Sequence, residues 1–218
     1  LATDLDGTLL RPDGTVSART VAALAQARAV GFPVLFVTGR PPRWLEPVVE
    51  TTGHAGIAVC ANGALTVDLD SGSVTSSRTL LGPTTSACAR DLRAAVPGTA
   101  FAVELVPTPT EVPAAGAARL TTRAYAHEPH YLPDSDARYG PLVGELDHLL
   151  AHGEVVKLLA RGPAGTDPEQ FLTRAREVLH GRVEVTRSMD IPLLEMSAHG
   201  VSKASALATY AAGLGIEQ

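Results

Sequence analysis

Two aspartates near the start of the chain have the type and spacing for nucleophilic or acid–base chemistry. Asp4 and Asp6 are two residues apart at the end of a predicted strand, so both side chains project from the same side. This places them at the carboxyl edge of the predicted sheet, where open α/β sheets bind ligands. Close like charges raise the pKa of one carboxyl, which then can donate a proton while the other stays ionised as a nucleophile or metal ligand. The alternative is a solvated Asp-Gly turn.

A second polar group follows the next strand. Thr38, Gly39 and Arg40 come directly after the apolar run 34–37, which places them at the same sheet edge as Asp4. A hydroxyl and a glycine amide at a strand end can bind a phosphoryl oxygen. Taken alone, the same residues also fit an ordinary turn that ends a strand.

Lys203 is one of only two lysines in the chain, and its predicted position is unusual. The segment 200–203 opens a predicted helix, so Lys203 lies in the first turn, beside the positive end of the helix dipole. A cation is unfavourable there unless an anion is bound nearby. The sequence therefore indicates an anion site at this helix start, with an exposed surface lysine as the alternative.

Alternating strands and helices position these residues. Ser17 can cap a helix that Gly31 ends, and the strand at 33–37 is apolar throughout, as expected for burial on both faces of a parallel sheet. A hairpin is predicted between 65–69 and 74–80. The order strand, helix, strand predicts an α/β fold with a right-handed crossover.

The chain changes character after the hairpin. A second α/β module is expected over 82–190, inserted into a first module formed by 1–81 and 191–218. The apolar strand around 193–196 and the alanine-rich helix at 201–212 are assigned to the first module, because an apolar strand followed by a helix is also the pattern of that module.

Composition limits the class of protein. The 218 residues carry a net charge of −5, which argues against a nucleic-acid reader with a basic stripe. No apolar run reaches the roughly 18 residues of a membrane span, and no export signal is visible, so we expect a cytoplasmic protein without a membrane partner. We assign no role to Cys60 and Cys88, and the segment 127–130, with two histidines, is expected to be a solvated loop.

Taken together and in this order, the motifs Asp4-Leu5-Asp6-Gly7-Thr8, Thr38-Gly39-Arg40-Pro41, Asn62-Gly63-Ala64 and Gly200-Val201-Ser202-Lys203 resemble the haloacid dehalogenase superfamily. Within it, the chain is most similar to the Cof-type (subfamily IIB) phosphatases. The resemblance implies a Rossmann-like parallel-sheet core with an inserted α/β cap of the C2 type, over essentially the whole chain.

The resemblance also implies roles for residues. Asp4 would attack phosphorus to form an aspartyl-phosphate, and Asp6 would act as general acid and base. Mg²⁺ would be held by the Asp4 carboxylate and the Asp6 backbone carbonyl. The remaining implied ligands fall into a phosphate-binding set and a substrate-binding set: Thr38, Gly39 and Lys203 for the phosphate, and Arg40 and Asn62 for the substrate.

One departure from the family concerns the metal. The family's fourth motif, Gly-Asp-x-x-Asn-Asp, supplies further magnesium carboxylates, and the sequence stops at Gln218 before any such motif. We expect either that the chain is a fragment or that its metal site is incomplete. The implied activity is hydrolysis of small phosphorylated metabolites, such as sugar phosphates or phosphorylated cofactors, by a monomer or weak homo-oligomer. A silent phosphometabolite-binding protein and a phosphomutase are the alternatives.

Overall fold

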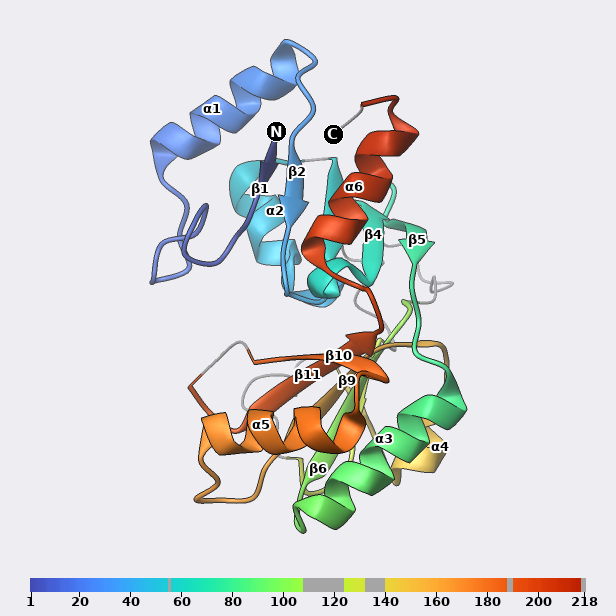
Figure 1. Ribbon diagram of the computed structural model, residues 1–218. Helices are drawn as coiled ribbons and strands as arrows, with labels where there is room; N and C mark the ends of the chain where they lie inside the picture. Colours follow the sequence, from blue (N-terminus) through green and yellow to red (C-terminus); the bar gives the residue numbers. More distant parts are fainter. Residues whose placement is uncertain (55, 108–123, 132–139, 188–189, 217–218) are drawn as a thin grey trace. The chain divides into compact units, whose positions relative to one another are not determined.

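The computed structural model describes residues 1–54, 56–107, 124–131, 140–187 and 190–216. Their contacts group them into two compact units, each with its own sheet (Figure 1). The first unit contains 1–77, 107 and 202–216, and the second contains 78–106, 124–131, 140–187 and 190–201. The chain therefore first enters the second unit after Ser77 and leaves it for the last time after Val201.

The first unit has a five-stranded sheet in which three neighbouring strands are parallel. The strands lie in the order β1 (Ala2–Thr3), β2 (Leu35–Val37), β3 (Ile57–Cys60), β4 (Leu65–Asp68) and β5 (Ser73–Ser77). The pairs β1–β2 and β2–β3 are parallel, with Ala2 opposite Leu35 and Phe36 opposite Ala58. The predicted α/β fold class is confirmed.

Helices position the ends of these strands. They are α1 (Ala18–Ala29), α2 (Glu46–Thr52) and α6 (Lys203–Gly213), with the short 3-10 helices η1 (Pro42–Trp44) and η2 (Ala61–Gly63). Ser17 caps α1 as predicted, accepting a hydrogen bond from the Thr20 amide at 3.0 Å. Gly31 follows the helix in the left-handed region, with φ of 70°. All three residues of β2 are buried, because helices cover both faces of the sheet.

The predicted hairpin is present but shorter than expected. Strands β4 and β5 pair antiparallel, and Asp68 lies opposite Ser73. Leu80, which we expected at the end of this hairpin, forms an isolated bridge with Val155 in the second unit instead. The Leu80 side chain accordingly joins the second unit's core.

The second unit has a six-stranded sheet that is antiparallel except for one pair. The strands lie in the order β10 (Val183–Thr186), β11 (Leu193–Ala198), β9 (Val155–Arg161), β6 (Ala100–Leu105), β7 (Tyr125–His127) and β8 (Leu142–Val143). The helices are α3 (Gly82–Ala95), α4 (Leu146–Leu150) and α5 (Pro168–Leu179). Helices α3 and α5 pack on the same face of the sheet (Figure 1), and the main apolar core lies between them and the strands.

The assignment of the strand around 193–196 to the first module was wrong. Strand β11 pairs antiparallel with β9 and with β10, both in the second unit. Leu194 and Met196 are fully buried in that unit's core, whereas Glu195 lies on the opposite face of the strand. The alternation of apolar and polar residues in β11 is typical of an antiparallel sheet with helices on one side. The parallel strand β2 of the first unit is instead buried on both faces.

No helix within the described ranges is both long enough and apolar enough to cross a bilayer.

Candidate active site

The first turn after β1 carries the two carboxylates singled out in the sequence. Leu5, between them, is completely buried, while Asp4 and Asp6 remain accessible. The turn closes through hydrogen bonds from the Thr8 and Leu10 amides to the Leu5 carbonyl, at 3.2 and 2.8 Å. The Leu5 amide in turn donates to Oδ1 of Asp4 at 2.7 Å, which fixes the orientation of that carboxylate.

Lys203 lies against the first of these carboxylates. Its Nζ donates to Oδ2 of Asp4 at 2.6 Å, and both side chains are a little over one third exposed. Lys203 is the first residue of α6, and Ser202 and Ser205 form a reciprocal capping box at that helix start. The anion expected near this lysine is therefore a carboxylate of the chain itself, 199 residues away in sequence.

Arg40 pairs with the second carboxylate. Its Nε and Nη2 donate to Asp6 in a bidentate arrangement, with distances of 2.9 Å from Nε to Oδ2 and 2.6 Å from Nη2 to Oδ1. The Asp6 side chain is 60% exposed and that of Arg40 26% exposed. Each carboxylate thus has its own cation, so the two aspartates do not form an isolated pair of like charges.

Thr38 and Gly39 connect β2 to Arg40. Thr38 is fully buried, and its amide donates to the Val59 carbonyl of β3 at 2.8 Å. Its hydroxyl oxygen accepts from the Arg40 amide at 3.0 Å, which makes a tight turn around Gly39. The backbone of this turn is part of the same unit as Asp4 and Lys203.

Asn62 lies in η2, directly after β3. Its Oδ1 would be 2.7 Å from a Cβ at position 39, so its amide lies over the Gly39 backbone. The structure therefore places all seven residues singled out in the sequence within one unit. Contacts join Lys203 to Asp4, Arg40 to Asp6, and Asn62 to the turn at Thr38 and Gly39.

The oxygen donors at this edge of the sheet are of the chemical type that magnesium prefers. Carboxylate and carbonyl oxygens are its preferred ligands, and in proteins it commonly keeps several waters and binds through one or two carboxylates. The Asp4 carboxylate is accessible and oriented by the Leu5 amide. However, within the described ranges no group of three or more His, Cys, Asp or Glu side chains is arranged to hold a metal.

The second unit contains two ion pairs in which the carboxylate is largely buried, and neither includes a residue of this site. Lys157 donates to Glu195 at 2.8 Å, and the two side chains are 3% and 13% exposed. Glu128 accepts from Nη2 of Arg93 at 2.6 Å and from the Phe101 amide at 2.8 Å.

The expectation of a solvated loop at 127–130 was therefore wrong for its first half. His127 ends β7 and, like Glu128, is buried, whereas Pro129 and His130 are exposed. The buried Glu128 carboxylate accepts hydrogen bonds from a guanidinium and from a backbone amide, which is a structural role. Sequence offered no signal for it, because the two partners of Glu128 come from other elements.

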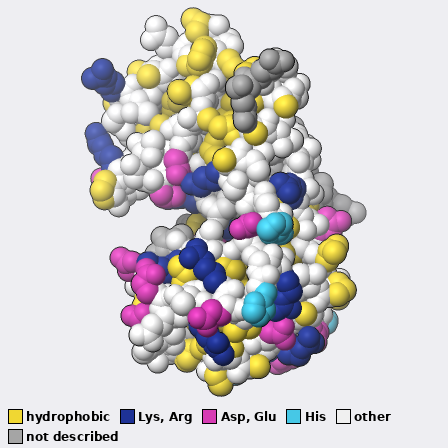
Figure 2. Space-filling model, viewed as in Figure 1, with side chains coloured by type: hydrophobic (Ala, Val, Ile, Leu, Met, Phe, Trp, Pro, Cys, Tyr) yellow, Lys and Arg dark blue, Asp and Glu magenta, His cyan; other side chains and the backbone are white. Residues whose placement is uncertain are grey.

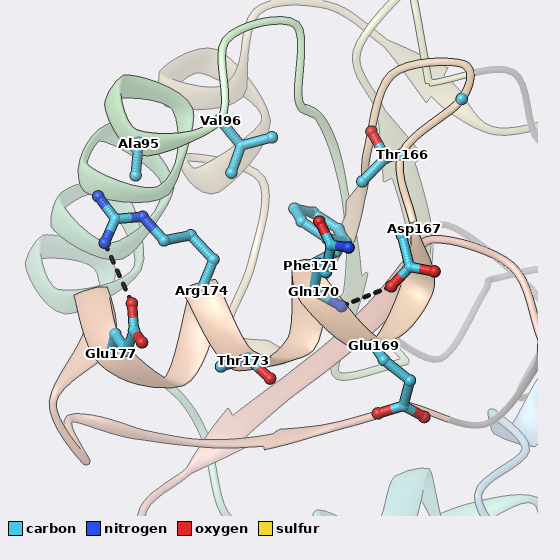
Figure 3. Close-up of a pocket in the computed structure, with 11 residues that line it drawn as sticks. Ala95, Val96, Thr166, Asp167, Glu169, Gln170, Phe171, Thr173, Arg174 and Glu177 are labelled. Carbon is cyan, nitrogen blue, oxygen red and sulfur yellow. Dashed lines mark hydrogen bonds and ion pairs between the residues drawn. The ribbon is translucent and has the colours of Figure 1, made fainter.

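A hollow in the second unit runs along α5 and the end of α3 (Figure 3). It has a volume of about 830 Å³ and contains none of the site residues predicted from sequence. Charged side chains line it, and one pair, Arg174 and Glu177, spans 3.1 Å. Asp167 accepts from the Gln170 amide and so caps α5.

Charges of both signs are interspersed on the face shown in Figure 2, without a continuous basic patch. This agrees with the net charge of −5. The two cysteines, Cys60 and Cys88, are buried and not joined in a disulfide, and burial raises the pKa of the Cys88 thiol. Neither observation suggests a second reactive centre.

These features define an α/β protein with two carboxylates and two cations at the carboxyl edge of parallel strands. Comparison with known proteins finds a family match for the first part of the chain. Residues 1–93 match the model of the haloacid dehalogenase-like hydrolases. A segment of 68 residues is 38% identical to the pyridoxal phosphate phosphatase YbhA of Escherichia coli (strain K12), covering 31% of this chain and 25% of that protein. The matched segment thus spans about a quarter of that relative's length.

Solved structures resemble the chain over nearly its whole length. BT1666 of Bacteroides thetaiotaomicron, a phosphatase of the haloalkanoate (HAD) enzyme superfamily, matches with a TM-score of 0.72 and 19% identity, covering 99% of this chain and 72% of that one. The HAD subclass IIB sugar phosphatase BT4131 matches with a TM-score of 0.70 and 14% identity, covering 99% and 76%. Residues 1–93 thus match the model of the haloacid dehalogenase-like hydrolases, and the chain shares the fold of these solved structures, in agreement with the resemblance found in the motifs.

Proposed function

We propose that the protein hydrolyses phosphomonoesters of small metabolites, such as sugar phosphates or phosphorylated cofactors. The observation that carries this proposal is the contact of Lys203 with Asp4 at 2.6 Å, beside the turn formed by Thr38 and Gly39. A cation, a backbone turn and an oriented carboxylate at one sheet edge suit the binding and transfer of a phosphoryl group. The phosphatase names of the sequence and structural relatives support it.

In the proposed mechanism Asp4 is the nucleophile. One carboxylate oxygen of Asp4 forms a bond to phosphorus while the bond from phosphorus to the leaving oxygen breaks. Asp6 gives its proton to the leaving oxygen and later takes a proton from water, which attacks phosphorus and releases inorganic phosphate from Asp4. Lys203 and the Gly39 amide stabilise the phosphoryl oxygens throughout.

Magnesium completes this proposal as the cofactor. The Asp4 carboxylate and the Asp6 backbone carbonyl would hold it, and it would neutralise charge on the phosphoryl oxygens. Arg40 is oriented by Asp6 and is assigned to the substrate beyond the phosphate. The specificity for that part of the substrate is assigned to the segment 82–190.

A second candidate function is binding of phosphorylated metabolites without turnover. It is favoured by one observation, namely that no cluster of three metal-ligating side chains exists within the described part of the chain. Too few protein ligands would weaken magnesium binding and with it the hydrolysis.

One assay separates the two candidates. The full-length protein is incubated with p-nitrophenyl phosphate and a panel of phosphorylated metabolites, with magnesium and with chelator, and released phosphate is measured. The hydrolase predicts magnesium-dependent release from several compounds. Binding of the same compounds by calorimetry, without release under either condition, would establish the silent binding protein instead. A requirement for a bisphosphate activator would indicate a phosphomutase.

A further inference from the structure

Three consecutive residues after β3 have left-handed backbone conformations. The φ angles are 51° for Ala61, 58° for Asn62 and 103° for Gly63. Glycine adopts this region freely and asparagine tolerates it, but for alanine it is disfavoured. Such a turn persists only where its surroundings impose it, and strained backbone of this kind gathers at functional sites.

Backbone hydrogen bonds tie this turn to the proposed phosphate-binding segment. The Ala61 amide donates to the Arg40 carbonyl at 3.0 Å, and the Asn62 amide donates to the Thr38 carbonyl at 3.1 Å. The backbone amides of Ala61 and Asn62 therefore both donate to the turn that follows β2. The Gly39 amide lies between these two anchored carbonyls in sequence.

The opposite end of the turn lies against the start of α6. A Cβ at Gly63 would be 2.2 Å from the Ser202 carbonyl oxygen, a distance that only glycine permits. Ser202 is the residue that caps α6 and precedes Lys203. The turn of η2 is thus packed between the segment at Thr38 and the segment that carries Lys203.

The Asn62 side chain completes this contact. Apart from the neighbouring residues in the chain, the three atoms nearest to a Cβ placed on Gly39 all belong to the Asn62 side chain, the nearest being Oδ1 at 2.7 Å. The amide of Asn62 therefore occupies the space that a side chain at position 39 would need. Glycine at 39 and asparagine at 62 are complementary in shape, and Asn62 is the only asparagine in the chain.

We propose that Asn62 is a positioning residue, which holds the Thr38–Gly39–Arg40 turn in its phosphate-binding form by packing over Gly39. It acts through Gly39 and makes no contact with the substrate. This assignment deepens the proposed function and rests on it, and it replaces the substrate-binding role expected from sequence. A rigid, preformed turn matters because misplacing a binding group by about 1 Å can cost about 100-fold in rate.

The test is a double-mutant cycle between positions 39 and 62 in the full-length protein. Asn62→Gly keeps the left-handed backbone accessible while removing the amide, so it isolates the side chain from the turn. We expect a roughly 10-fold loss of affinity for inorganic phosphate, measured by calorimetry with magnesium present. Gly39→Ala alone, whose Cβ displaces the Asn62 amide, should lose about 100-fold.

The two changes together should be strongly non-additive. In the Asn62→Gly background the space beside position 39 is empty, so Gly39→Ala should cost less than about 3-fold more. If Gly39→Ala loses the same factor in both backgrounds, position 39 does not act through Asn62 and the assignment is overturned. A urea unfolding curve for each variant verifies that it is folded.

Substrate preference distinguishes positioning from substrate contact. A positioning residue affects all substrates equally, so Asn62→Gly should leave the kcat/KM ratio between p-nitrophenyl phosphate and a sugar phosphate unchanged. A changed ratio would mean that Asn62 touches the leaving group, contrary to the proposal. The matched control is His180→Gly, another left-handed residue (φ of 47°) that ends α5 in the second unit, and it should not alter phosphate affinity.

The calorimetric cycle does not require turnover. If the wild-type protein hydrolyses nothing yet the phosphate-binding cycle is non-additive, the hydrolase proposal fails while the role of Asn62 stands. If the wild-type protein hydrolyses phosphomonoesters and the cycle is additive, the role of Asn62 fails while the hydrolase proposal stands. Failure of the wild-type protein to bind phosphate at all would overturn both.

Discussion

Replacement of Gly63 by alanine should damage both the stability and the activity of the first unit. A Cβ at this position would lie 2.2 Å from the Ser202 carbonyl oxygen and 3.1 Å from the Ala206 Cβ. Real Cβ contacts stay beyond 3.0 Å, so the start of α6 would have to move by about 0.8 Å, the difference between 3.0 and 2.2 Å. The φ of 103° adds a second cost, because alanine rarely adopts it.

The two costs can be estimated separately. Forcing a group into a well-packed site costs about 1–3 kcal/mol. A non-glycine residue in such a backbone conformation costs about 1–3 kcal/mol more. We therefore expect Gly63→Ala to lower the free energy of unfolding by about 4 kcal/mol, and the shift of Lys203 that follows to reduce kcat/KM by about 100-fold.

The measurement uses the single tryptophan of the chain. Trp44 lies in the first unit, so its fluorescence in urea reports the unfolding of the unit that contains Gly63. Gly31→Ala is the matched control, because Gly31 also lies in the first unit and has a positive φ (70°), but no atom lies within 4 Å of the position that a Cβ would take there. It should cost about 1 kcal/mol and leave the activity unchanged. Equal losses of stability in the two variants, with equal activities, would show that the close approach of Gly63 to Ser202 is not present.

Four further expectations follow from the structure. Asp4→Asn should abolish turnover because an amide cannot attack phosphorus, and Asp6→Asn should lower kcat by about 10² to 10⁴-fold; substantial residual activity of Asp4→Asn in a steady-state assay would exclude it as nucleophile. Exchanging the segment 78–201, which carries the second unit, with that of a relative should transfer the substrate profile, and a profile that stays with the remainder would locate specificity there. Glu128→Ala should lower the free energy of unfolding by about 1–3 kcal/mol in urea titrations, since it leaves the buried Phe101 amide without its acceptor; a loss below about 0.5 kcal/mol would contradict this. Burial, with a smaller effect of a nearby arginine, lowers the pKa of His54 below its usual 6.5, so the unfolded chain binds this proton first and stability should fall as pH drops below 6.5. The slope should be at most about 1.4 kcal/mol per pH unit and should be absent in His54→Gln; an unchanged slope in that variant would refute the assignment.

Local signals in the sequence were sufficient for the framework of the first unit. The uninterrupted apolar run in β2 indicated burial on both faces, and Ser17 and Gly31 marked the two ends of α1. The position of Asp4 and Asp6 just after the first strand followed from the break of the strand pattern at Gly7 and Thr8. Each of these features depends on neighbours within a few positions, which is why sequence alone could reveal it.

Features that depend on distant partners could not be predicted in this way. Strand β11 has an apolar face that suits more than one sheet, and only pairing with β9 and β10 assigns it to the second unit. The burial of Glu128 depends on Arg93 and Phe101, which are far from it in sequence. The left-handed turn around Asn62 likewise depends on its hydrogen bonds to the segment after β2.

Lys203 lies at the first position of α6 and contacts Asp4, and the energetics of these two features bear on its role. Ser202 and Ser205 cap α6 without help from the lysine, so the helix does not need a cation at its first position. There the helix dipole opposes the charge, which costs a few tenths of a kcal/mol or more. The pair with Asp4 offers little in return, because both side chains are more than one third exposed and such pairs contribute about 0–1 kcal/mol. Stability therefore does not explain why a lysine occupies this position. The proposed function would explain it, since a transferred phosphoryl group would bring more negative charge to this site than the carboxylate of Asp4 supplies alone.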